Sequence, residues 1–137
     1  AHLSGADEDT CTHLEQFGVA SGVAFQITDD VLDLVGEQDV VGKSVGKDLD
    51  KGKLTLPIIY ALSGVGEESR EMLIKLIKER DLDRLRIELD KCGSIERAMQ
   101  SASLLVDQAK QELCCLPESP SRNLLASLAD GILERRF

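Results

Sequence analysis

The segment from Asp7 to Val35 most constrains the fold of this chain, because its small and apolar residues recur at the spacing of one long helix. Acidic residues at its start suit the N-terminus of a helix. The small or apolar positions cover a broad face rather than a narrow stripe, and they are Leu14, Phe17, Gly18, Ala20, Ser21, Ala24, Phe25, Ile27, Thr28, Val31, Leu32 and Val35. A helix with so broad a face is buried over most of its circumference.

The rest of the chain also shows helical spacing, with no strand alternation. Helices are expected over residues 55–64, 67–80, 81–91, 94–116 and 121–135. The residues expected to face inward on the last of them are Leu124, Leu125, Leu128 and Ile132. Pro117 and Pro120 are expected to break the helix before them, and residues 37–54, which contain several glycines and lysines, are expected to form a loop. The sequence therefore predicts an all-α fold, with residues 1–137 forming a single helical domain.

Charge and composition exclude two classes of partner. The chain has a net charge of -9 and only 3% aromatic residues, with no Trp. A protein this acidic is poorly suited to the nucleic-acid backbone, and it has too few aromatic rings to stack on bases. No apolar run is long enough for a transmembrane segment, and the first residues do not resemble a signal peptide.

The cysteines and histidines give no sign of a structural metal or disulfide framework. The four cysteines show no CxxC spacing, so a reduced, cytoplasmic protein is expected. Cys11 and His13 alone are too sparse for a zinc site. His2 and His13 are expected at the surface.

Three carboxylates interrupt the apolar pattern near the end of the first expected helix. Asp29 and Asp33 lie one turn apart on the same face, and Asp30 lies about 100° away from Asp29. Their neighbours are apolar, and like charges on a buried helix repel one another and lose hydration. A divalent cation such as Mg²⁺ would offset both effects, because hard cations prefer carboxylate oxygens. We interpret the three as metal ligands; the alternative is a solvated acidic face.

The loop that follows supplies positive charge through Lys43, Lys47 and Lys53. Ammonium groups and the backbone N–H groups of such loops bind phosphate. The loop is not a P-loop, since no strand precedes it. It is not an EF-hand either, since the twelfth position counted from Asp48 is Ile59 rather than Glu. Taken alone it would read as a flexible charged loop, but its place directly after the aspartates favours a metal-bridged diphosphate site.

Together these residues resemble the second aspartate-rich region of the trans-isoprenyl diphosphate synthases, whose pattern is roughly FQxxDDxLD followed by GKxxGxDLxxGKxTLP. The matching residues are Phe25-Gln26, Asp29-Asp30, Leu32-Asp33, Gly42-Lys43, Gly46, Asp48-Leu49, Gly52-Lys53 and Thr55-Leu56-Pro57. The match is closest to the long-chain branch of octaprenyl, heptaprenyl or geranylgeranyl type. It is sharp over residues 1–65, and beyond them it rests on helical content alone.

The resemblance implies a helical bundle around a deep cavity, with Mg²⁺ holding the diphosphate of an allylic substrate. It implies a prenyltransferase, in which the double bond of isopentenyl diphosphate attacks the allylic cation. The assigned residues are Asp29, Asp30 and Asp33 as metal ligands, Lys43 and Lys53 as diphosphate-binding groups, and Phe25 and Gln26 as cavity lining, with Asp29, Asp30, Lys43 and Gln26 as the catalytic set. Members of the family are usually dimeric, so a homodimer is expected.

The chain departs from the family in lacking a first aspartate-rich motif and the arginine pair for isopentenyl diphosphate. Asp7-Glu8-Asp9 has the wrong spacing for that motif and is expected to start a helix. The chain is therefore expected to be the C-terminal half of a synthase and to be inactive alone. The alternatives are a non-catalytic helical subunit and a protein like the class I terpene synthases, and the lysine-rich loop argues for the chain-elongating enzymes.

Overall fold

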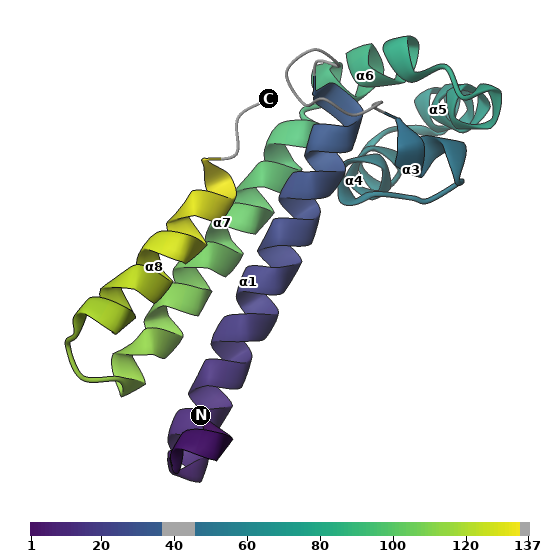
Figure 1. Cartoon of the computed structure of the whole chain (residues 1–137). Coiled ribbons are helices and arrows are strands. Elements are labelled where there is room, and N and C mark those ends of the chain that lie inside the picture. Colours follow the sequence, from purple (N-terminus) through teal and green to yellow (C-terminus); the bar gives the residue numbers. More distant parts are fainter. Residues whose placement is uncertain (37–45, 135–137) are drawn as a thin grey trace. The chain divides into compact units, whose positions relative to one another are not determined.

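The computed structural model describes residues 1–36 and 46–134, and every regular element in these ranges is a helix. The predicted all-α class is thus confirmed. The chain divides into two compact units, with residues 1–26 and 101–136 in unit 1 and mainly residues 27–100 in unit 2. Two helices contribute to both units, α1 (Glu8–Val35) and α7 (Ser94–Glu112) (Figure 1).

Unit 1 contains η1 (His2–Ser4), the first part of α1, the second part of α7, η2 (Leu113–Cys115) and α8 (Pro120–Leu133). Helices α7 and α8 run alongside each other (Figure 1), and the Lys110 ammonium pairs with the Asp130 carboxylate at 2.7 Å between them. The buried residues of unit 1 are mostly small, which allows the helices to approach closely, and include Ala24, Ala102, Val106, Ala109, Leu113 and Ala129.

The helix ends of unit 1 follow local capping rules, which confirm one prediction and correct another. The acidic residues start α1 as predicted, and the Asp7 carboxylate caps it by accepting a hydrogen bond from the Thr10 N–H at 2.8 Å. Helix α8 begins at Pro120, not after it, and the Ser119 hydroxyl accepts from the Arg122 N–H at 3.2 Å. Proline suits this first position because the N–H that it lacks would have no partner there.

The buried face of α8 also differs from the prediction. Leu124 and Leu128 were expected to face inward, but each is 60% exposed, while Ala129 is buried. Helical periodicity fixes which residues share a face but does not say which face meets α7. The prediction is wrong for Leu124 and Leu128, whereas Leu125 and Ile132 are partly buried.

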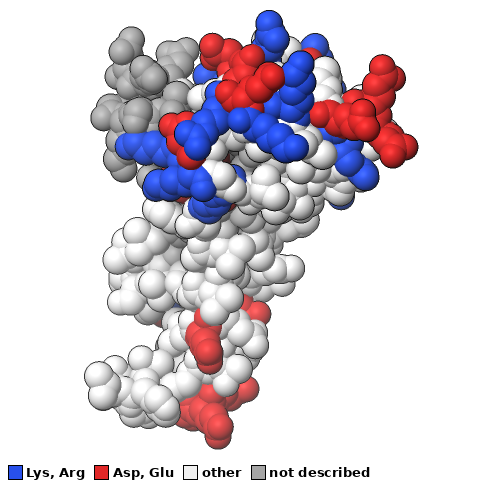
Figure 2. Space-filling model, turned by 90° about the vertical axis from the view of Figure 1, so that its right-hand side faces the viewer, with Lys and Arg blue, Asp and Glu red and all other residues white. Residues whose placement is uncertain are grey.

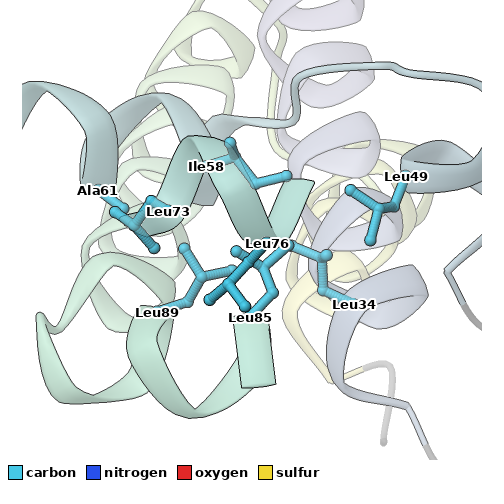
Figure 3. Packing of buried hydrophobic residues seen from close by; sticks show 8 residues of the cluster. All are labelled: Leu34, Leu49, Ile58, Ala61, Leu73, Leu76, Leu85 and Leu89. Carbon is cyan, nitrogen blue, oxygen red and sulfur yellow. The ribbon is translucent and has the colours of Figure 1, made fainter. Parts of the chain in front are cut away.

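Unit 2 is built around a cluster of aliphatic side chains. Helices α4 (Leu56–Gly64), α5 (Glu67–Glu79) and α6 (Leu82–Lys91) supply most of it, and the end of α1 and the short α3 (Lys47–Asp50) add one residue each. The buried residues of the cluster are Leu34, Leu49, Ile58, Ala61, Leu73, Leu76, Leu85 and Leu89 (Figure 3). Burial of these side chains is the main force that holds unit 2 together.

Helix α3 lies inside the segment predicted as a loop. It has only four residues, too few to be stable without tertiary contacts, so no local pattern signals it. Leu49 attaches it to the core and is 4% exposed. In Figure 3 Leu49 lies on the same side of the cluster as Leu34 of α1.

The end of α1 is fixed by two hydrogen bonds to its last carbonyl groups. The Gly36 N–H donates to the Leu32 carbonyl at 2.8 Å, and the Arg86 guanidinium of α6 donates to the Val35 carbonyl at 2.6 Å. A cation at this end also complements the helix dipole. The turns that carry the three aspartates therefore belong to a well-anchored helix end.

No helix in the described ranges has the length and hydropathy that a membrane crossing requires.

Candidate metal and diphosphate site

The three predicted metal ligands lie on the last two turns of α1 with different environments. Asp29 is exposed, Asp30 is 7% exposed and Asp33 is half-buried. The rotation of about 100° between consecutive residues separates Asp30 from Asp29, whereas Asp33, one turn after Asp29, meets the start of α3. Asp29 thus faces solvent, whereas Asp30 and Asp33 face other parts of unit 2.

Lys53 joins two of the acidic residues of unit 2. Its ammonium group lies 3.0 Å from a carboxylate oxygen of Asp30 and 3.2 Å from one of Asp48. The hydrogen bond to Asp30 is the main reason why the pKa of Lys53 is raised; Asp48 adds to the effect and burial opposes it. Lys53 is therefore cationic throughout the physiological range, and its charge compensates the buried carboxylate of Asp30.

Asp33 makes a different set of contacts. Its two carboxylate oxygens accept hydrogen bonds from the backbone N–H groups of Lys47, at 3.2 Å, and Asp48, at 2.9 Å. Its own carbonyl oxygen accepts from the N–H of Gly46 at 2.7 Å. Asp33 therefore holds the beginning of α3 against the end of α1.

The turn into α3 requires glycine at position 46. Gly46 has φ 79°, in the left-handed region that residues with a Cβ rarely adopt. A Cβ at this position would also lie 2.8 Å from a methyl carbon of Leu82. The glycine pattern of the sequence thus reflects both backbone conformation and close packing here.

The structure brings together four acidic or basic side chains, those of Asp30, Asp33, Asp48 and Lys53. Asp48 is the member that the site prediction lacked, although it lies in the matched motif. Its distance of five residues from Lys53 was the sequence feature that could have suggested the pair. The pair was missed because Asp48 lies in the first turn of α3, and the local sequence does not reveal that helix.

The roles assigned to Phe25, Gln26 and Lys43 remain predictions. Phe25 and Gln26 belong to unit 1 and are exposed, Phe25 by 45%. Lys43 lies outside the described residues. Their assigned roles in a cavity and in diphosphate binding therefore rest on the sequence motif.

The acidic residues fit a magnesium ion that is shared with a phosphate ligand better than a closed protein cage. Within residues 1–36 and 46–134, no group of three or more His, Cys, Asp or Glu side chains is arranged to hold a metal. Magnesium, however, is usually bound by one or two carboxylates together with waters and substrate phosphates. Asp30 and Asp48 already converge on one cationic group, the Lys53 ammonium, so the oxygen donors suit a hard cation.

Charges of both signs lie close together on unit 2. Figure 2 looks onto the side where α3 lies in Figure 1, and Lys and Arg side chains gather there among Asp and Glu. Lys47, Lys51 and Lys53 are among the exposed residues of this segment. A surface of this kind can bind an anion and a divalent cation together, which neither charge alone would favour.

Comparison with known proteins gives a consistent match. The sequence profile of the polyprenyl synthetase family matches residues 1–92, which include α1 and the Asp30–Lys53 contact. A short chain isoprenyl diphosphate synthase of Methanothermobacter thermautotrophicus is 39% identical over 138 residues, covering 98% of this chain and 42% of that protein.

Two solved structures agree in fold. The decaprenyl diphosphate synthase from Rhodobacter capsulatus matches with a TM-score of 0.86 and 36% identity, over 97% of this chain and 42% of that one. The polyprenyl synthase from Caulobacter crescentus, complexed with calcium and isoprenyl diphosphate, matches with a TM-score of 0.86 and 32% identity over the same shares, 97% and 42%. The chain thus spans about two fifths of the length of these relatives. It belongs to the polyprenyl synthetase family and corresponds to the C-terminal part of its members.

Proposed function

We propose that the protein carrying this chain is a trans-polyprenyl diphosphate synthase, which joins isopentenyl diphosphate to an allylic diphosphate. The observation that carries the proposal is the meeting of Asp30, Asp48 and Lys53 at one point beside the exposed Asp29. These residues lie in a segment that matches the family. Carboxylates and an ammonium group at one place are the groups that a metal–diphosphate ligand needs.

In this proposal Asp29 and Asp30 are the ligands of Mg²⁺, and Lys43 and Lys53 bind the allylic diphosphate. Phe25 and Gln26 line the cavity for the hydrocarbon chain, with Gln26 close to the reacting carbons. The sequence assigns Asp33 as a third ligand, yet its contacts with the backbone of α3 favour a different role.

The chemistry requires stabilisation of the departing diphosphate. Mg²⁺, when bound, would neutralise charge that develops on the leaving group. Lys53 adds a second positive charge, and Asp30 and Asp48 hold its ammonium in place before the substrate arrives. When a diphosphate binds, Lys53 can exchange a carboxylate partner for a phosphate oxygen, and both are charge-assisted hydrogen bonds.

The activity is tested by incubating the whole protein with Mg²⁺, an allylic diphosphate and isotope-labelled isopentenyl diphosphate. We expect labelled products longer than the allylic primer by five-carbon steps. A cyclised or hydrolysed primer without incorporated label would instead indicate terpene synthase chemistry. Absence of any product would favour a non-catalytic subunit.

We further propose that the 137-residue chain is inactive alone, since the described residues include no closed metal site. The same assay on the isolated chain should give no elongated product, and clear turnover would contradict this. A cytoplasmic location and a homodimeric assembly also belong to the proposal. Sedimentation of the whole protein tests the dimer.

A further inference from the structure

We propose that Asp33 is a positioning residue rather than a metal ligand. Its carboxylate fixes the backbone at the start of α3 and thereby places Asp48 and Lys53 beside Asp30. The consequence for diphosphate binding rests on the proposed function, but the structural role of Asp33 can be tested without it.

The first step is the direction of the Asp33 carboxylate. Both of its oxygens accept backbone N–H groups, from Lys47 and from Asp48. These donors are 14 and 15 residues away in sequence. The carboxylate thus faces the start of α3.

The second step is the need of α3 for such a partner. The first N–H groups of any helix lack acceptors within the helix. The residue at the N-cap position is Gly46, which has no side chain to supply one. Asp33 provides two acceptors from another element, and Leu49 attaches this short helix to the core.

The third step leads from α3 to the cationic group. The Asp48 N–H donates a hydrogen bond to the Asp33 carboxylate, and the Asp48 carbonyl oxygen accepts one from the Lys53 N–H at 2.9 Å. Its carboxylate then holds the Lys53 ammonium, which also reaches Asp30. If α3 loses its anchor, the position of Lys53 relative to Asp30 is no longer defined.

The test compares Asp33→Ala with Asp33→Asn in the whole protein. Asparagine retains an oxygen acceptor and is as good as aspartate at capping helices, but it loses the negative charge that a metal ligand requires. Glu15→Gln serves as the control, because it neutralises an exposed acid of the same helix that belongs to unit 1.

The first readout is amide hydrogen exchange without metal or diphosphate. In Asp33→Ala, the exchange of the Lys47 and Asp48 amides should rise roughly fivefold or more, as expected for loss of a cap. In Asp33→Asn the Asp48 amide, which makes the shorter bond to Asp33, should stay within about twofold of the parent, because the one remaining oxygen can accept it. The Lys47 amide loses its acceptor and should exchange faster than in the parent. The Glu15→Gln control should leave both amides unchanged. Equal exchange in all four proteins would overturn the proposal whatever the activity of the protein.

The second readout is the affinity for inorganic pyrophosphate in the presence of Mg²⁺, measured by calorimetry. Asp33→Ala should weaken it by roughly fivefold, and Asp33→Asn, which keeps one of the two acceptors, should recover part of that loss. A metal ligand would respond differently, since Asn and Ala would weaken binding equally. That result would overturn the proposal. If no form of the protein binds pyrophosphate, the proposed function fails, and the exchange measurement still decides the role of Asp33.

Discussion

Lys53 shows how an ordinary-looking surface lysine acquires a defined role. Its side chain is 45% exposed, and exposed ion pairs usually contribute little to stability. The Asp30 side chain, however, is only 9% exposed, so removal of Lys53 withdraws the partner of a buried carboxylate. Asp48, the other partner, lies at the surface of the same small cluster and is 20% exposed.

The change Lys53→Met should therefore lower the free energy of unfolding by about 1 kcal/mol, because a buried carboxylate loses a charged hydrogen bond. Urea unfolding followed by circular dichroism measures the effect. Lys51→Met, at an exposed position two residues earlier, is the matched control and should change the stability by less than about 0.5 kcal/mol. Equal effects of the two substitutions would show that Lys53 does not support Asp30.

A second prediction at this scale concerns Gly46. Gly46→Ala should destabilise the protein by about 1–2 kcal/mol, since the left-handed backbone disfavours a Cβ and Leu82 leaves it too little room. Gly131→Ala within α8 is the control, where an added Cβ meets no atom within 4 Å and alanine favours the helix. Thermal unfolding compares the two variants, and an unchanged melting temperature for Gly46→Ala would contradict the packing described here.

At the scale of elements, periodicity predicted the long helices well and short or tertiary features poorly. Helix α5 was expected over residues 67–80 and is observed over Glu67–Glu79. This prediction was accurate because the apolar residues of α5 recur at helical spacing along its whole length. Helix α3 was missed, because its caps come from Asp33 and its core contact from Leu49, both of which depend on the folded chain. The metal and lysine assignments came from motif spacing, whereas Asp48 became a partner only through α3.

His13 illustrates the same limit in unit 1. It was expected simply at the surface, but it joins α1 to α7, with its Nδ1 atom 2.6 Å from a carboxylate oxygen of Glu112. This hydrogen bond is the main reason why the pKa of His13 is raised; burial opposes the shift and the nearby Asp9 adds to it. A sequence separation of 99 residues leaves no local signal for such a pair.

The pair predicts a pH dependence with a defined sign. Because the folded-state pKa of His13 lies above the unfolded value, the stabilisation is complete below the unfolded pKa and is lost as pH rises through the folded one. Urea unfolding at about pH 5.5 and about pH 8.5, on either side of the histidine range, should show that His13→Gln loses more stability at the lower pH. Glu112→Gln should reduce this difference. A loss that is equal at both pH values, or larger at the higher one, would contradict the pair.

At the scale of the whole molecule, an acidic chain carries a cluster of lysines within the segment that matches the family. The matched segment of residues 1–92 contains both the aspartates of α1 and the Lys53 contact. The relatives extend well beyond it, since the chain covers 42% of the short chain isoprenyl diphosphate synthase. The fold class and the acidic segment could be predicted from sequence, because both depend on residue spacing. The pairing of Asp48 with Lys53 could not, since it depends on how α3 packs.

The measurement that tests the central claim most directly is calorimetric binding of a non-hydrolysable allylic diphosphate analogue to the whole protein. Titrations with and without Mg²⁺ are compared for the parent and for Asp29→Asn. If carboxylates of α1 hold a metal that holds the diphosphate, binding should weaken by roughly tenfold or more when either Mg²⁺ or the Asp29 charge is removed. Removing both should cost little more than removing one, because the two losses have the same cause. Equal binding in all four titrations would contradict the account.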